Sequence, residues 1–175
     1  MINSIIRYTL TIFLLILLQI VLFNNIQLSG YINPYVYIMA VLILPATLPQ
    51  WLILIISFLT GFFVDLFSGS PGMHASATLL AGFVRPYVLT LIAPRDGYEQ
   101  GSDLSIATYG VRWYFTYTTI IVVIHHLMLF YLEVFRLTDF FRTMFRVILS
   151  SAVTIAFIML AGYYLKGRRR AGSRV

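Results

Sequence analysis

The sequence predicts an all-α membrane protein with about six transmembrane helices. Of its 175 residues, 60% are hydrophobic and only 10% are charged, whereas a soluble domain carries about 25% charged residues. The apolar residues also form runs comparable with the ~20 residues that a helix needs to cross a bilayer. These observations exclude a soluble enzyme, a disordered tail and a coiled coil. The absence of cysteine further excludes disulfides, thiolate metal sites and a cysteine nucleophile.

The first predicted span runs from Tyr8 to Phe23, and Gln19 is its main polar interruption. Because Arg7 precedes this apolar run, a signal peptide is the alternative interpretation. The residues that follow, 24–27, include none of the small side chains typical of a cleavage site. We therefore interpret this segment as an uncleaved span.

The next apolar block, residues 34–67, is too long for one helix. Pro45 and Pro49 divide it, since proline disfavours the continuation of a helix. We expect a short second span over Pro34–Leu44, extended by about one turn, and a third span over Gln50–Phe67. Whether the short second span crosses completely decides between six spans and five.

The stretch Ser68–Gly72 is the strongest turn signal in the chain, because it combines serine, glycine and proline. Residues 94–108 form the only long polar loop. The remaining spans are predicted at Met73–Ile92, Arg112–Leu132 and Val147–Leu165. The chain therefore divides into a six-helix transmembrane domain over residues 1–165 and a basic tail over residues 166–175.

Six spans place both termini on one side, and the excess of lysine and arginine identifies that side as the cytoplasm. The inner set is Arg7, Arg95, Arg112, Lys166, Arg168, Arg169, Arg170 and Arg174, against Arg136, Arg142 and Arg146 outside. The basic tail, with Lys166, Arg168, Arg169 and Arg170, is expected to attract anionic lipid. Contact with an acidic cytoplasmic partner is its second possible role.

Two charged residues lie inside predicted spans. Asp65, near the outer end of the third span, has two interpretations: a carboxylate that locks the Ser68–Gly72 turn, which we favour, or a proton or cation ligand. Arg85 lies about twelve residues into the fourth span, ~18 Å deep, and we expect it to reach toward the inner headgroups as an anchor. An ideal hairpin does not place Arg85 opposite Asp65, so we expect no direct ion pair.

The histidines are expected to make hydrogen bonds between helices rather than to bind zinc. His74 opens the fourth span, and His125 and His126 are adjacent in the fifth. Adjacent residues point about 100° apart on a helix, so we do not expect this pair to share one ligand site. Small residues four positions apart, such as Ser57 and Gly61, predict close helix packing.

Residues 133–146 are amphipathic. Arg136 and Arg142 belong to a polar stripe, and Phe140 and Phe141 belong to the apolar remainder. This pattern fits a helix that lies in the outer interface. It fits equally a docking surface for the extracytoplasmic part of a partner, or a ramp that leads back into the sixth span.

The sequence contains no Walker-type loop, no nucleophile elbow, no dinucleotide fingerprint and no pair of acids. The loops are also too short to house a soluble active site. We therefore expect no enzymatic activity, no cofactor, no metal site and no nucleic-acid binding. Such a chain must act through its spans, by moving a solute or by holding other proteins.

Asn33-Pro34 opens the predicted second span, and residues 61–74 follow the pattern G-x-x-x-D-x-x-S-G-S-P-G-x-H. Together with the length and the span layout, this stretch resembles the MreD family, the integral membrane component of the bacterial rod-shape system. The residues that match the family's pattern are Gly61, Asp65, Gly69, Pro71 and Gly72, in a stretch that ends at His74. The amphipathic segment and the long polar loop have no counterpart that aligns.

The resemblance implies a helical fold similar to the substrate-binding subunits of energy-coupling-factor vitamin transporters, in the bacterial cytoplasmic membrane. It implies binding to MreC, a single-span protein with an extracytoplasmic domain. It also implies membership of an elongation machinery with MreB filaments, a SEDS-type glycosyltransferase and a penicillin-binding transpeptidase. No catalytic activity is associated with the family.

Two functions remain open: a membrane scaffold that helps to regulate peptidoglycan synthesis, and a small-solute binding or transport subunit. A solute site needs convergent polar groups that face a cavity, whereas the polar residues of these spans are scattered in depth. The first span is bulky throughout and lacks the small-residue face expected for docking to a transporter. Both points favour the scaffold, with the hairpin 61–74 as a structural or partner-binding element.

Overall fold

The computed structural model describes residues 2–25, 32–99, 103–134 and 140–172. The regular elements of this part of the chain are helices, as the sequence predicts. Four of them, α1, α3, α5 and α6, are long and apolar enough to cross a membrane. The elements are α1 (Ile2–Val21), η1 (Phe23–Asn25), η2 (Val36–Ile38), α2 (Met39–Leu42), α3 (Gln50–Ser68), α4 (Met73–Leu91), α5 (Ile106–Val134) and α6 (Phe140–Gly172).

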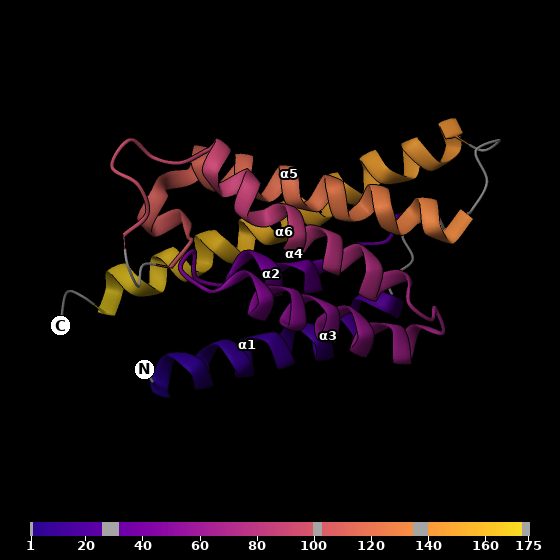
Figure 1. Ribbon diagram of the computed structural model, residues 1–175, viewed down its shortest axis with the longest axis horizontal. Coiled ribbons are helices and arrows are strands. Elements are labelled where there is room, and N and C mark those ends of the chain that lie inside the picture. The colour runs from indigo at the N-terminus through magenta and orange to yellow at the C-terminus, as the bar shows by residue number, and fades with distance from the viewer. Residues whose placement is uncertain (1, 26–31, 100–102, 135–139, 173–175) are drawn as a thin grey trace.

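The long helices lie lengthwise in one elongated bundle (Figure 1). Helix α4 packs between α3 and α5, α6 packs against α5, and α1 lies beside α3. Both chain termini lie at the same end of the bundle, together with the connections 43–49 and 92–99, and we call this the terminal end. The opposite end holds the connection 69–72, and we call it the turn end.

The predicted second span is only partly helical. The 3₁₀-helix η2 has three residues and α2 has four, which gives about 12 Å, far short of the ~30 Å of a bilayer. Residues 36–42 are at most 5% exposed. Irregular backbone is tolerated at such depth because it is enclosed by protein rather than by lipid. We refer to residues 33–45 as the embedded segment.

The turn between α3 and α4 forms where the sequence predicts it. Gly69 and Gly72 adopt φ angles of 64° and 84°, a region that glycine enters without steric cost. Beyond this turn, α3 and α4 approach each other closely at Gly61. A Cβ atom placed there would lie 2.4 Å from the backbone oxygen of His74, so this crossing requires glycine.

The last two helices begin earlier than predicted. Helix α5 begins at Ile106 instead of Arg112, with a break in helical geometry at Gly110. Helix α6 begins at Phe140, so residues 140–146 of the amphipathic segment form its first turns and not a separate interfacial helix. Arg136 lies outside the described residues. Helix α6 also continues to Gly172, which places the backbone at Lys166 and Arg168–Arg170 inside it.

Candidate functional site

The embedded segment places one tyrosine hydroxyl between two helices. The Tyr37 hydroxyl oxygen lies 3.0 Å from Nδ1 of His74, at the start of α4. It also lies 2.7 Å from Nε2 of His125, in α5. All three side chains are buried. Tyr37 is therefore the hub of a polar cluster that ties the embedded segment to two neighbouring helices.

The cluster extends to α6 through His126. Nδ1 of His126 lies 2.9 Å from the Val122 carbonyl oxygen, and because a carbonyl can only accept, this nitrogen carries the proton. In the neutral ring, Nε2 then accepts the hydroxyl of Thr154 at 3.2 Å. The Thr154 oxygen in turn accepts the backbone N–H of Tyr35 at 3.0 Å, which fixes the start of the embedded segment.

Two further contacts complete the surroundings of the hub. Nδ1 of His125 lies 3.5 Å from Nδ1 of His126, whose proton already goes to a backbone carbonyl oxygen. The Thr78 hydroxyl lies 3.3 Å from the Tyr37 oxygen and donates to the His74 carbonyl oxygen at 2.7 Å. We call these residues, His74, Tyr37, His125, His126 and Thr154, the histidine chain.

The histidines form hydrogen bonds between helices, as the sequence predicts: His126 of α5 lies 3.2 Å from the Thr154 hydroxyl of α6. His125 and His126 also have different partners, although their rings are 5.3 Å apart, centroid to centroid. The sequence did not predict the tyrosine that joins His74 and His125. The hub was missed because Tyr37 lies in an apolar run and resembles a core aromatic residue. No group of three or more His, Cys, Asp or Glu side chains is arranged to hold a metal ion within the described part of the chain.

Asp65 caps the first turn of α4 from the neighbouring helix. Its carboxylate accepts the backbone N–H groups of His74 at 3.0 Å and Ala75 at 2.9 Å. It also accepts the Ser70 hydroxyl at 3.1 Å. The first N–H groups of a helix have no partner inside that helix, and the residue that would cap α4, Gly72, offers no side chain. The geometry is that of a turn-locking carboxylate.

Arg85 does not reach toward a surface, which differs from the anchor predicted above. Its side chain is 0% exposed. The guanidinium donates to the carbonyl oxygen of Leu44 and, at 2.8 Å, to the hydroxyl of Tyr117. The last carbonyls of a helix lack intrahelical partners and carry partial negative charge. Arg85 therefore satisfies the end of the embedded segment, far along α4 from the turn that Asp65 holds.

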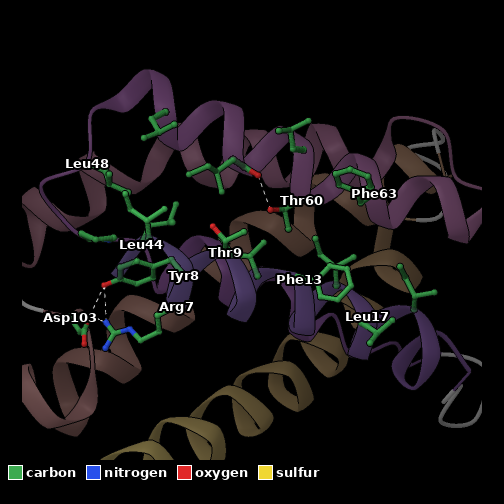
Figure 2. A pocket seen from close by; sticks show the side chains of 18 of the residues that line it. Arg7, Tyr8, Thr9, Phe13, Leu17, Leu44, Leu48, Thr60, Phe63 and Asp103 are labelled. Atoms are coloured by element: carbon green, nitrogen blue, oxygen red, sulfur yellow. Dashed lines mark hydrogen bonds and ion pairs between the residues drawn. The ribbon is translucent and has the colours of Figure 1, made fainter. Parts of the chain in front are cut away.

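A groove of about 1300 Å³ lies between α1 and α3 (Figure 2). It extends along α1 from Ile5 to Val21 and along α3 from Leu52 to Phe67. Aliphatic and phenylalanine side chains form most of its walls. Its charged side chains lie at the terminal end, where Figure 2 shows Arg7 and Tyr8 beside Asp103. No pattern in the sequence predicts this groove, because it depends on how α1 is placed relative to α3.

The residues expected to form an outer surface lie at the turn end of α6. Phe141 is 86% exposed, and Phe140 packs its ring 6.1 Å from that of Tyr131. Nearby, Arg146 joins α6 to α5 through an ion pair with Glu133 at 3.2 Å. These contacts hold the two helices together beside an exposed phenylalanine.

The all-helical bundle and its long apolar helices define the class, a helical protein suited to a membrane. Several of its interior polar groups hydrogen-bond to one another, and a groove opens on its side. No protein-family model, curated protein or solved structure matches this chain. The function must therefore be inferred from the sequence and the geometry.

Proposed function

We propose that this chain is a non-catalytic membrane scaffold of the MreD type. It crosses the bacterial cytoplasmic membrane with both termini, and hence the terminal end, in the cytoplasm. It binds an MreC-like single-span protein and acts with MreB, a SEDS-type glycosyltransferase and a penicillin-binding transpeptidase. In this role it helps to regulate peptidoglycan synthesis and cell shape. The motif at residues 61–74 supports the proposal from the sequence.

The groove between α1 and α3 is the observation that carries the proposal. From Ile5 to Val21 it follows α1 over about 24 Å at 1.5 Å per residue, which is most of the thickness of a bilayer. Half the cross-section of a helix about 10 Å wide occupies roughly 900 Å³ over that length, and the groove, at about 1300 Å³, has room for it. The groove thus suits one face of an apolar transmembrane helix, and we assign the helix of the single-span partner to it.

The histidine chain supports a scaffold over a solute-binding subunit. A small-solute site presents a few polar groups that converge on an open cavity. Here Tyr37, His125 and His126 are fully buried and hydrogen-bond to one another or to backbone. Polar groups that satisfy one another in this way stabilise a fixed interior and leave little capacity for a ligand.

The turn end supports the same function from the other side of the membrane. Asp65 fixes the first turn of α4, and the close crossing at Gly61 holds α3 against α4. The hairpin 61–74 is therefore a rigid corner. It presents a defined surface to the extracytoplasmic part of the partner.

The first test is to purify the tagged chain mildly from its native membrane and to identify what accompanies it. We expect stoichiometric recovery of a single-span protein with an extracytoplasmic domain. Recovery of paired ATPases with a large transmembrane subunit, or of the chain with a bound small molecule, would refute the scaffold and support the solute-binding class.

The second test locates the partner with a matched pair of cysteines in a chain that has none of its own. Ile56 lines the groove, whereas its neighbour Ile55 lies outside it and is exposed. In the complex, Ile56→Cys should react with a membrane-permeable maleimide more slowly than in the isolated chain, and Ile55→Cys should react at an unchanged rate. Equal rates at Ile56→Cys with and without the partner contradict docking in the groove.

A further inference from the structure

Helix α1 is attached to the bundle less extensively than the other long helices. Only 11% of its span is buried, compared with 28–44% for α3, α5 and α6. It forms one wall of the groove, with Ile12, Phe13 and Ile16 among its lining residues. Its polar contacts with the rest of the bundle are gathered near its two ends, and they differ in kind.

At the turn end, α1 is held by buried hydrogen bonds. Gln19 is 1% exposed, and its amide donates to the Pro34 carbonyl oxygen at 3.1 Å and accepts the Tyr37 backbone N–H at 3.4 Å. Just beyond the helix, Asn24 makes an exposed hydrogen bond to the Ser68 hydroxyl at 2.9 Å. Breaking the two Gln19 bonds leaves buried backbone groups without partners, which is costly.

At the terminal end, α1 is held by an ion pair near the surface. Arg7 contacts a carboxylate oxygen of Asp103 at 2.7 Å, and the side chains of Arg7 and Asp103 are 53% and 18% exposed. The hydroxyl of Tyr8 donates to the same oxygen at 2.5 Å. Exposed ion pairs contribute little to stability, and salt screens them. This attachment is therefore the weaker of the two.

The helix between these attachments has no internal breaking point. Residues 8–18 contain no proline and no glycine, the residues at which helices commonly kink. When the weaker attachment opens, α1 must therefore tilt as a rod about Gln19. From Arg7 to Gln19 the rod is about 18 Å long, so a tilt of ~10° moves its free end by about 3 Å.

We propose that α1 is a hinged strap, which pivots at Gln19 and opens the groove from the terminal end when the contacts of Asp103 release. The strap regulates access to the docking groove, and this regulatory role rests on the function proposed above. The tilt of α1 itself does not require a partner. It can therefore be measured without a partner, and its failure is distinct from a failure of docking.

The test measures distances between nitroxide labels on paired cysteines by pulsed electron paramagnetic resonance, with the chain in lipid nanodiscs. Ile5→Cys with Trp51→Cys spans α1 and α3 at the terminal end, and Val21→Cys with Leu66→Cys spans them at the turn end. All four native side chains are exposed, so the labels disturb little packing. We expect a broad distribution for the first pair and a narrow one for the second.

Releasing the weak attachment should lengthen and broaden the terminal-end distribution alone, by about 3 Å for a ~10° tilt. Asp103→Asn weakens it directly, and raised salt weakens it without any substitution. Glu133→Gln is the matched control, because it breaks a different ion pair, with Arg146, at a site distant from α1. Gln19→Leu should instead broaden the turn-end pair.

Two results would overturn the strap. The first is a terminal-end distribution that is as narrow as that at the turn end and unchanged by Asp103→Asn and by salt. The second is a turn-end pair that broadens together with the terminal-end pair, since that would show that α1 moves as a whole and does not pivot at Gln19.

Discussion

Replacement of Tyr37 by phenylalanine tests whether the histidine chain holds the bundle together. The substitution keeps the ring and removes only the hydroxyl. It therefore deletes the bonds to His74 at 3.0 Å and to His125 at 2.7 Å, together with a longer contact of 3.3 Å to the Thr78 hydroxyl. Both partners are buried, so no water can readily replace the missing oxygen.

The expected loss can be worked from these two bonds. Hydrogen bonds between membrane helices average about 0.6 kcal/mol and reach about 1.7 kcal/mol. Two of them give a loss of about 1–3 kcal/mol in the free energy of unfolding. The upper half of this range is the more relevant, because a buried nitrogen without a partner carries its own penalty.

The assay is reversible unfolding by SDS in mixed micelles, followed through the two tryptophans. Tyr35→Phe is the matched control. Tyr35 belongs to the same embedded segment and its ring also packs against His74, at 5.1 Å, but its hydroxyl is not part of the histidine chain. We expect it to cost at most about 1 kcal/mol. If Tyr37→Phe is no more destabilising than Tyr35→Phe, the histidine chain is not what ties the embedded segment to the bundle.

Three further predictions use the same assay. Asp65→Asn removes the charge from the α4 cap and should cost about 1 kcal/mol, so unchanged stability would contradict the capping role. Gly61→Ala should destabilise the protein by about 1–3 kcal/mol, and by more than Gly82→Ala. The reason is that the new Cβ at position 61 meets backbone atoms, whereas that at position 82 meets the Ser57 side chain. A larger loss of stability for Gly82→Ala would refute the close crossing. Arg85→Lys should lower stability measurably, since an ammonium cannot reproduce the guanidinium's fork of contacts, and equal stability would show that those contacts matter little.

The helical class and the ends of α3 and α4 could be predicted because they depend on local signals. Apolar runs of membrane length identify helices, and the glycines at 69 and 72 identify the turn. The role of Asp65 was also accessible, because an aspartate a few residues from such a turn commonly accepts its backbone hydrogen bonds. These inferences need no knowledge of which helices are neighbours.

The hub, the buried arginine and the groove depend on which segments meet, and the sequence does not give that information. Tyr37 is 88 residues from His125 along the chain, and no local pattern links them. Arg85 was expected to reach for headgroups because the sequence does not reveal that the embedded segment ends beside it. The second span was overestimated because hydropathy cannot distinguish a helix from irregular backbone enclosed by other helices.

Several buried polar side chains of this bundle provide hydrogen bonds to the backbone of the embedded segment. A non-helical backbone in a membrane must find partners for groups that a helix would satisfy internally. At the start of the segment, the side chains of Thr154 and Gln19 hydrogen-bond to its backbone. At its end, the guanidinium of Arg85 does the same. These three buried polar side chains are thus explained by the backbone that they satisfy. A chain with a fixed interior of this kind presents its adaptable surface outward, at the groove beside α1, and it is there that we expect its biological interactions to be found.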